Sequence, residues 1–206
     1  MDLNNLFDKL KHEAKALTGN ESKDTFFSSE AIFPDEETAK KTFPEARKRL
    51  FDINKWTDKP DLTTPFELYS NSGKKTTSDP QKGYFIKITL PGIPVENWVE
   101  ITELQENSDM ATFTVHPCPN PFESDEKTQH FFVQETSSTF KVARQGNKII
   151  ASETGRNEFI NNQEEAGSRA ALNTLIAEGG WAVFQKILWQ DLADYWACKE
   201  KAANKN

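Results

Sequence analysis

Seven short segments in which apolar and polar residues alternate, all between residues 65 and 155, constrain the fold more than any other feature. A period of two places every second side chain on the same face of a strand, whereas a helix repeats every 3.6 residues. Residues that favour turns separate the segments. The pattern therefore predicts an antiparallel β-sheet of six to eight strands over about 65–155, as a meander or a small barrel. The segments are 65–70, 84–90, 97–104, 110–115, 130–135, 139–144 and 148–153.

Segments with helical periodicity precede the predicted sheet. Residues 2–18 and 33–56 predict two N-terminal helices, and a polar stretch over 20–29 lies between them. Asp35 is suited to cap the second helix because its carboxylate can accept from an unpaired N–H of the first turn. Pro44 is expected to kink or divide this helix, since proline has no N–H to donate.

A second helical region follows the predicted strands. Residues 162–199 predict a C-terminal helical pair, and the later helix carries a wide apolar stripe that must pack against the sheet or a partner. Helices, then strands, then helices indicate one α+β domain over 1–206, with a helical N-terminal part over 1–56. Either the sheet closes into a barrel or the flanking helices cover it, and the pattern allows both.

Composition and charge argue against several classes of function. The formal net charge is −7 and the pI is about 5.1, which disfavours nucleic-acid binding. There is no apolar run of membrane-spanning length, no secretory signal pattern, and two cysteines do not build a disulfide framework. The sequence contains no nucleotide-binding, α/β-hydrolase or EF-hand motif. We therefore expect a cytoplasmic protein with no membrane or nucleic-acid partner and no cofactor.

A histidine and a cysteine two positions apart, His116 and Cys118, form the first candidate site. A nearby imidazole can lower the pKa of a thiol, and His130 could join the pair as a third ligand for a metal. Residues i and i+2 share one face of any strand, so the proximity is equally consistent with a strand end that has no chemistry. Three prolines at 117, 119 and 121 are expected to stop strand pairing after Val115.

The turn after the last predicted strand is the second candidate site. It carries opposite charges and an amide beside a glycine, in Glu153, Arg156, Asn157 and Glu158. An arginine fork there could hold an anionic ligand. The alternative is that Arg156 pairs with Glu153 or Glu158 and that Asn157 shapes the turn.

Aromatic residues are unusually frequent on the predicted strands, and Trp98 and Phe131 are two of them. Such rings line ligand-binding faces and equally fill ordinary cores. We interpret Trp98 and Phe131 as candidate ligand contacts.

Three functions are consistent with these patterns. The first is a non-enzymatic protein that binds a small, partly apolar or anionic molecule on the concave face of the sheet, with Arg144 or Arg156 as polar anchor. The second is an interaction module or homodimer, built on the aromatic C-terminal helix through Trp189 and Trp196. The third is an enzyme or metal site that uses the histidine and cysteine cluster.

Overall fold

The computed structural model describes residues 23–58, 64–89, 96–123, 132, 134–158 and 181–203. Seven strands, three α-helices and one 3-10 helix lie in this part of the chain. They are β1 (Lys23–Ile32), α2 (Glu36–Phe51), the 3-10 helix η1 (Ile53–Asp58), β2 (Phe66–Tyr69), β3 (Phe85–Thr89), β4 (Glu96–Asn107), β5 (Met110–Cys118), β6 (Ser137–Gln145), β7 (Lys148–Glu158), α4 (Trp181–Trp196) and α5 (Lys199–Ala203). None of the helices described here is long and apolar enough to cross a membrane.

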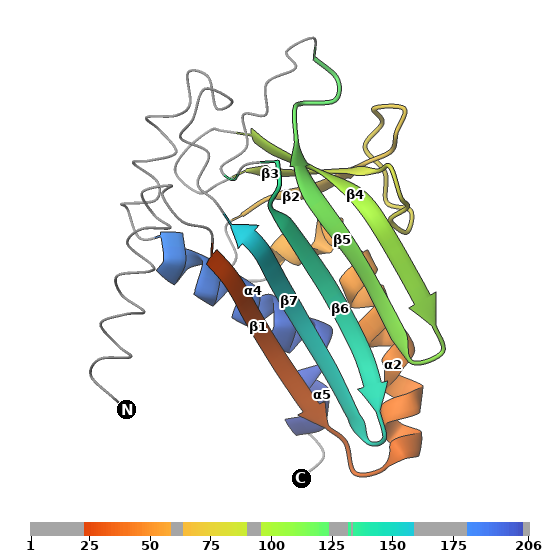
Figure 1. Cartoon of the computed structure of the whole chain (residues 1–206). Helices are drawn as coiled ribbons and strands as arrows, with labels where there is room; N and C mark the ends of the chain where they lie inside the picture. The colour runs from red at the N-terminus through yellow and green to blue at the C-terminus, as the bar shows by residue number, and fades with distance from the viewer. Residues whose placement is uncertain are drawn as a thin grey trace, which may run out of the picture.

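The seven strands form one antiparallel sheet in the order β1-β7-β6-β5-β4-β3-β2 (Figure 1). The α+β prediction is confirmed. The sheet is open, because β1 and β2 lie at its two edges, so the closed barrel that the sequence also allowed is not formed. Six predicted strands are present. Of the seventh, over 130–135, the structure describes 132, 134 and 135, and 134–135 form a turn rather than a strand.

Strand β1 was not predicted. It covers most of the stretch that the sequence suggested to be a polar connection, and it pairs with β7 over its whole length. Its apolar residues are few, so apolar and polar residues alternate only weakly along it. Its strand conformation is therefore specified by pairing with β7 and not by its local pattern. The sheet therefore begins at Lys23 and not near residue 65.

Helix α2 begins as the sequence predicts. The carboxylate of Asp35 accepts a hydrogen bond from the Thr38 N–H at 2.7 Å, and Glu36 and Glu37 occupy the first turn. The helix is not divided at Pro44 but runs on to Phe51. The predicted helix over 2–18, and the first helix of the predicted C-terminal pair, lie outside the described residues.

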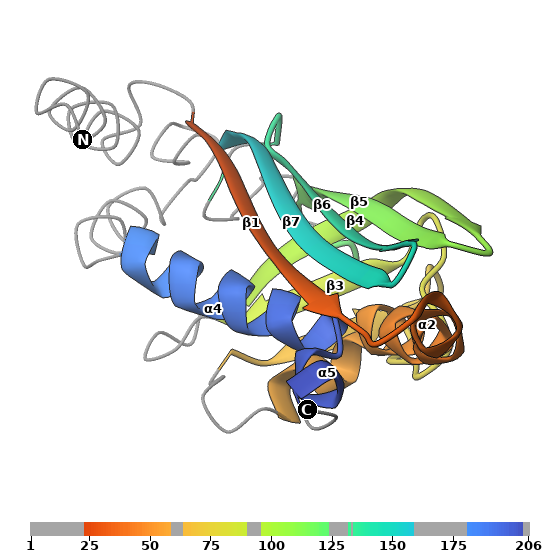
Figure 2. The same cartoon turned by 90° about the horizontal axis from the view of Figure 1, so that it is seen from below.

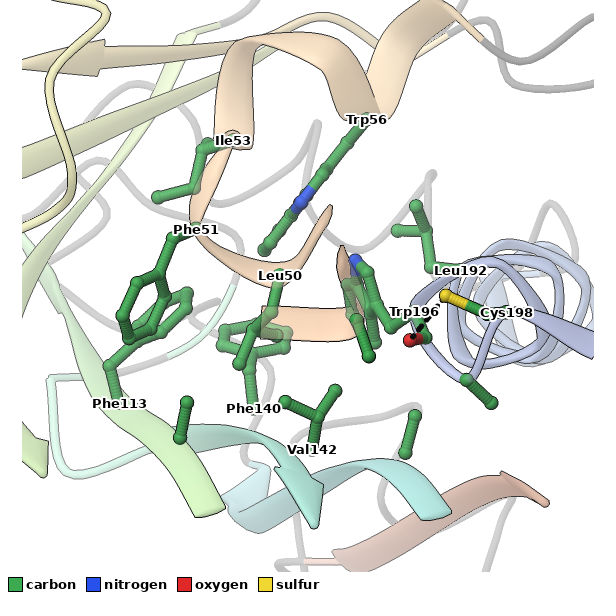
Figure 3. Packing of buried hydrophobic residues seen from close by; sticks show 14 of the residues in the cluster. Leu50, Phe51, Ile53, Trp56, Phe113, Phe140, Val142, Leu192, Trp196 and Cys198 are labelled. Atoms are coloured by element: carbon green, nitrogen blue, oxygen red, sulfur yellow. Dashed lines mark hydrogen bonds between the residues drawn. The ribbon is translucent and has the colours of Figure 1, made fainter. Parts of the chain in front are cut away.

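Helices α2 and α4 lie on the same, concave side of the curved sheet, which we call the inner face (Figure 2). The core fills the space between them and the sheet (Figure 3). At its centre the ring of Trp56 from η1 lies 4.9 Å from that of Trp196 and 5.4 Å from that of Phe140. Large aromatic side chains thus connect η1 and α4 to β6.

Over residues 188–196 the apolar stripe of α4 faces this core. Trp196 is fully buried and Trp189 is 8% exposed, with its ring 5.4 Å from that of Phe140. The expected dimer contact through Trp189 and Trp196 is therefore wrong, because both indoles pack inside their own chain. Among the side chains described in this helix, from 186 onward, Ile187 is large, apolar and exposed.

Candidate functional site

The inner face of β7 changes from apolar to polar along the strand. Ile149 and Ala151 belong to the core, and the next two residues of the same face are Glu153 and Gly155. Directly paired residues of adjacent strands share a face. The pairing therefore places four further residues around this end of the inner face: Thr25 and Phe27 of β1, and Ser138 and Phe140 of β6.

A β-bulge turns one more carboxylate to the same end. Lys23 pairs with Glu158 and Thr25 with Gly155, so two residues of β7 lie opposite the single residue Asp24. Asn157 adopts a left-handed conformation with φ of 52°, and a bulge of this kind redirects the side chains that follow it. Without the extra residue, Glu158 would lie on the outer face.

Asp24 holds the bulge from the neighbouring strand. Its carboxylate accepts hydrogen bonds from the Arg156 guanidinium and from the Asn157 backbone N–H, the latter at 3.1 Å. Both contacts lower the pKa of Asp24. The Asn157 carbonyl accepts from the buried Thr136 hydroxyl at 2.8 Å. Three side chains and one backbone amide thereby fix the direction of β7 just before Glu158.

Glu153 is completely buried, and neither of its carboxylate oxygens has a hydrogen-bond partner of normal geometry in the described structure. Burial, and secondly the neighbouring charge of Glu158, raise the pKa of Glu153 well above its usual value, against a smaller lowering effect of the Ser138 hydroxyl. A buried carboxyl group without hydrogen bonds is costly, because it has lost water and gained nothing in return. Such a group marks a place where a partner is expected.

Glu158 approaches the same region from the bulge. It is 4% exposed, and its Oε1 accepts a hydrogen bond of 2.9 Å from the Thr25 hydroxyl. A Cβ atom at Gly155 would collide with both of these groups, so the absence of a side chain there makes room for Glu158 over the strand. Two carboxyl groups thus share the polar end of an inner face that is otherwise apolar.

The two arginines predicted as ligand anchors lie far apart. Arg156 is 60% exposed and pairs with Asp24, so the alternative that it pairs with Glu153 or Glu158 is wrong. Arg144 lies at the other end of β6, where it pairs with Glu36 and Asp109. Arg144 lies on the inner face opposite Ile149, but far from Glu153. Asn157 is exposed and shapes the bulge, and of the three predicted residues at this end only Glu158 turns inward.

Trp98 lies on the opposite, outer face of the sheet. Its ring is 5.1 Å from that of Tyr69 and 5.4 Å from that of Phe122, which folds back from the segment after β5. It therefore belongs to a separate aromatic cluster and does not contact the inner-face carboxyls. Phe131 lies outside the described residues.

The histidine and cysteine pair also lies on the outer face, where His116 is paired with Glu100 and Cys118 with Trp98. The His116 ring nitrogen Nδ1 is 3.0 Å from the Thr102 hydroxyl oxygen. Burial and the charge of Glu100 raise the pKa of the Cys118 thiol to about 12, which opposes a nucleophilic thiolate. The described residues hold no cluster of metal-binding side chains, and His130 lies outside them.

Pairing continues beyond Val115, contrary to the expectation from the prolines. Pro117 pairs with Val99 and Cys118 with Trp98, so β5 stays paired with β4 to its end. Pairing with β6 does stop at Val115, opposite Ser138. One side of the strand therefore loses its partner where the prolines begin, and proline is tolerated in strands at such edges.

The sequence placed Glu153 in the second candidate cluster but did not predict it as a ligand contact, and it did not indicate Thr25 or Ser138. One signal was present for Glu153. In the segment "KIIASE" it continues the apolar phase of Ile149 and Ala151, so a charged residue occupies a core-facing position. Nothing local marks Thr25 or Ser138, which join the site through strand pairing.

No protein-family model matches the sequence, and no curated protein sequence matches it. Solved structures resemble its fold at low sequence identity. The extracellular domain of PknH from Mycobacterium tuberculosis is 8% identical, with a TM-score of 0.36 over 76% of this chain and 57% of that one. The chain thus spans little more than half of that domain.

Two further solved structures align with this chain over almost their whole length. A hypothetical protein from Helicobacter pylori is 11% identical, with a TM-score of 0.47 over 88% of this chain and 92% of that one. A point mutant of norcoclaurine synthase from Thalictrum flavum is 13% identical, with a TM-score of 0.41 over 84% and 96%. These similarities concern the fold, and we infer function from the residues of this chain.

Proposed function

We propose that this chain is a small-ligand-binding protein whose ligand lies against the inner face of the sheet, at the end of β1, β7 and β6. The observation that carries the proposal is Glu153, fully buried and without a hydrogen-bond partner for either oxygen in the described structure. A protein that keeps such a group in its interior needs a partner for it, and a bound molecule can supply one.

The surroundings favour a ligand with one polar end. Phe27 and Phe140 lie beside Glu153 on the neighbouring strands, and their rings supply an apolar wall. Thr25 and Glu158 supply polar groups next to them. Glu158, which the sequence predicted as a ligand contact, is kept in the proposal, and Arg144 and Arg156 are replaced by the two glutamates.

A dye-binding experiment with a steric block tests this proposal. The uncharged dye N-phenyl-1-naphthylamine gains fluorescence in apolar sites, and we expect the full chain to bind it. Ser138→Phe adds a ring on the inner face opposite Gly155, so it should weaken dye binding at least tenfold. Ser152→Phe is the matched control, because Ser152 lies on the outer face of β7 opposite Lys141.

Circular dichroism and thermal unfolding establish that both variants are folded. The proposal is wrong if the full chain does not bind the dye, or if the folded Ser138→Phe and Ser152→Phe variants bind it equally well.

A further inference from the structure

Glu153 has no cation to pair with among the described residues. Burial and then the charge of Glu158 raise its pKa, and the Ser138 hydroxyl is the one described group that opposes them. Lys23 is paired directly with Glu158 on the same face, whereas Glu153 is paired with Phe27, four residues further along β1. Four residues of strand span about 13 Å. The strand pairing therefore places Lys23 beside Glu158 and not beside Glu153.

The two glutamates are for this reason chemically different groups. Glu158 accepts a hydrogen bond from the Thr25 hydroxyl and has a lysine as its direct neighbour across the strands, so it can stay ionised. A carboxylate at Glu153 would be buried with neither a hydrogen bond nor a counterion, which costs far more than burial of the neutral acid. Glu153 is therefore a carboxylic acid near neutral pH, with an O–H group that can donate.

This form of Glu153 decides which ligands can satisfy it. An O–H donor needs an acceptor, and an ammonium ion has none to offer. A carboxylate ligand has acceptors, but it would bring a negative charge into an apolar site beside the charge of Glu158. An uncharged carbonyl oxygen accepts a hydrogen bond without adding a charge.

We propose that the site selects an uncharged carbonyl compound with an apolar substituent. Its carbonyl oxygen accepts the hydrogen bond that Glu153 can donate, and the substituent lies against Phe27 and Phe140, the direct strand neighbours of Glu153. The observation that carries the inference is the complete burial of Glu153 without a hydrogen bond or a cation in the described structure. The inference rests on the proposed function. Of the ligands expected from the sequence, it keeps the partly apolar molecule and sets aside the anionic one.

Displacement of N-phenyl-1-naphthylamine by matched ketones and hydrocarbons tests this inference on the full chain. Acetophenone and ethylbenzene share one frame, and 2-acetylnaphthalene and 2-ethylnaphthalene share a larger one. A hydrocarbon leaves water more readily than its ketone, so the readout is the affinity for the ketone divided by the affinity for the hydrocarbon, compared between variants at pH 6.

Glu153→Leu removes the donor and should lower this ratio about tenfold in at least one frame, because the carbonyl oxygen would be buried without a partner. Glu153→Gln should keep the ratio close to that of the wild-type protein, because its side-chain amide can still donate an N–H to the carbonyl. Glu30→Leu is the matched control and should leave the ratio unchanged, since Glu30 lies on the outer face of β1, where it pairs with Lys148. Circular dichroism establishes that all three variants are folded.

The inference is overturned if neither ketone displaces the dye, or if Glu153→Leu lowers the ratio less than about threefold in both frames. It is equally overturned if Glu153→Gln lowers the ratio as far as Glu153→Leu does, or if benzylamine or benzoate displaces the dye more readily than acetophenone. Dye binding that persists and is still blocked by Ser138→Phe would then leave the proposed function standing, whereas absence of dye binding would overturn both.

Discussion

Asp24 and Asn157 are joined by a hydrogen bond of 3.1 Å from the Asn157 backbone N–H to Asp24 Oδ1, across 133 positions of sequence. This contact lies on the outer face, yet it governs the inner one, because the bulge it holds turns Glu158 toward Glu153. An exposed residue of an edge strand therefore positions a buried group of the proposed site.

Asp24→Ala should weaken ligand binding more than it weakens the fold. Loss of hydrogen bonds at an exposed position costs about 1 kcal/mol of unfolding free energy, while release of the bulge allows Glu158 to leave the inner face. We expect at least a fivefold loss of affinity for N-phenyl-1-naphthylamine, measured by fluorescence titration alongside urea denaturation. Glu30→Ala on the same strand removes a surface ion pair with Lys148 and should leave affinity unchanged. Equal effects of the two variants would contradict the role of Asp24.

Glu153→Gln should become more stable relative to the wild-type protein as the pH rises. The raised pKa means that folded Glu153 keeps a proton at pH values where the unfolded chain, with a pKa near 4.5, has lost it. The wild-type free energy of unfolding therefore falls with pH in that window, by up to about 1.4 kcal/mol per pH unit for one proton. Glutamine carries no such proton.

Urea denaturation of the ligand-free proteins from pH 4 to pH 8 measures this difference. We expect the two proteins to approach each other toward pH 4 and to diverge above it. Glu30→Gln serves as control and should show no comparable slope. A constant difference between Glu153→Gln and the wild-type protein across the range would show that Glu153 is ionised in the folded state.

Trp196→Ala should destabilise the fold without changing the protein's state of association. The indole is fully buried between Trp56 and Phe140, and its removal leaves a large cavity. The expected loss is about 3–5 kcal/mol of unfolding free energy, whereas Ile187→Ala on the exposed side of α4 should cost little. Light scattering should give the same state of association for both folded variants. Conversion of a dimer to a monomer by Trp196→Ala alone would contradict this account.

Both cysteines should react slowly with iodoacetamide in the native protein. Burial raises the pKa of the Cys118 thiol and of the Cys198 thiol to about 12, so little thiolate is present near neutral pH. Mass spectrometry at pH 8 should show little alkylation of the native chain and complete alkylation in urea. Rapid native labelling of Cys118 would revive the reactive-cysteine hypothesis.

Local patterns predicted most elements of the described fold. Period-two segments marked six of the seven strands, and Asp35 marked the start of α2. Helical periodicity marked α4, but the width of its apolar stripe left open whether the covering surface was this chain or another. The structure places Trp189 and Trp196 against their own sheet, so the stripe is core.

The site was harder to predict because its members come from three strands. Thr25 lies on a strand whose own alternation is weak, and it meets Glu158 only because β1 pairs with β7. A single extra residue at Asn157 moved Glu158 from the outer face to the inner one, whereas Arg156 faces outward by strand alternation alone. No spacing rule in one segment specifies such a bulge.

The sequence by itself determined the α+β class, the phase of the strands and the position of a charged residue, Glu153, in the apolar phase of β7. These are local properties, set by which side chains alternate along a few residues of backbone. Pairing of β1 with β7, the clamp of Asp24 on the bulge and the meeting of two carboxyls beside Phe140 depend on the tertiary structure. The contacts between β1 and β7 join residues more than a hundred positions apart, and they form only when the whole sheet packs against its helices.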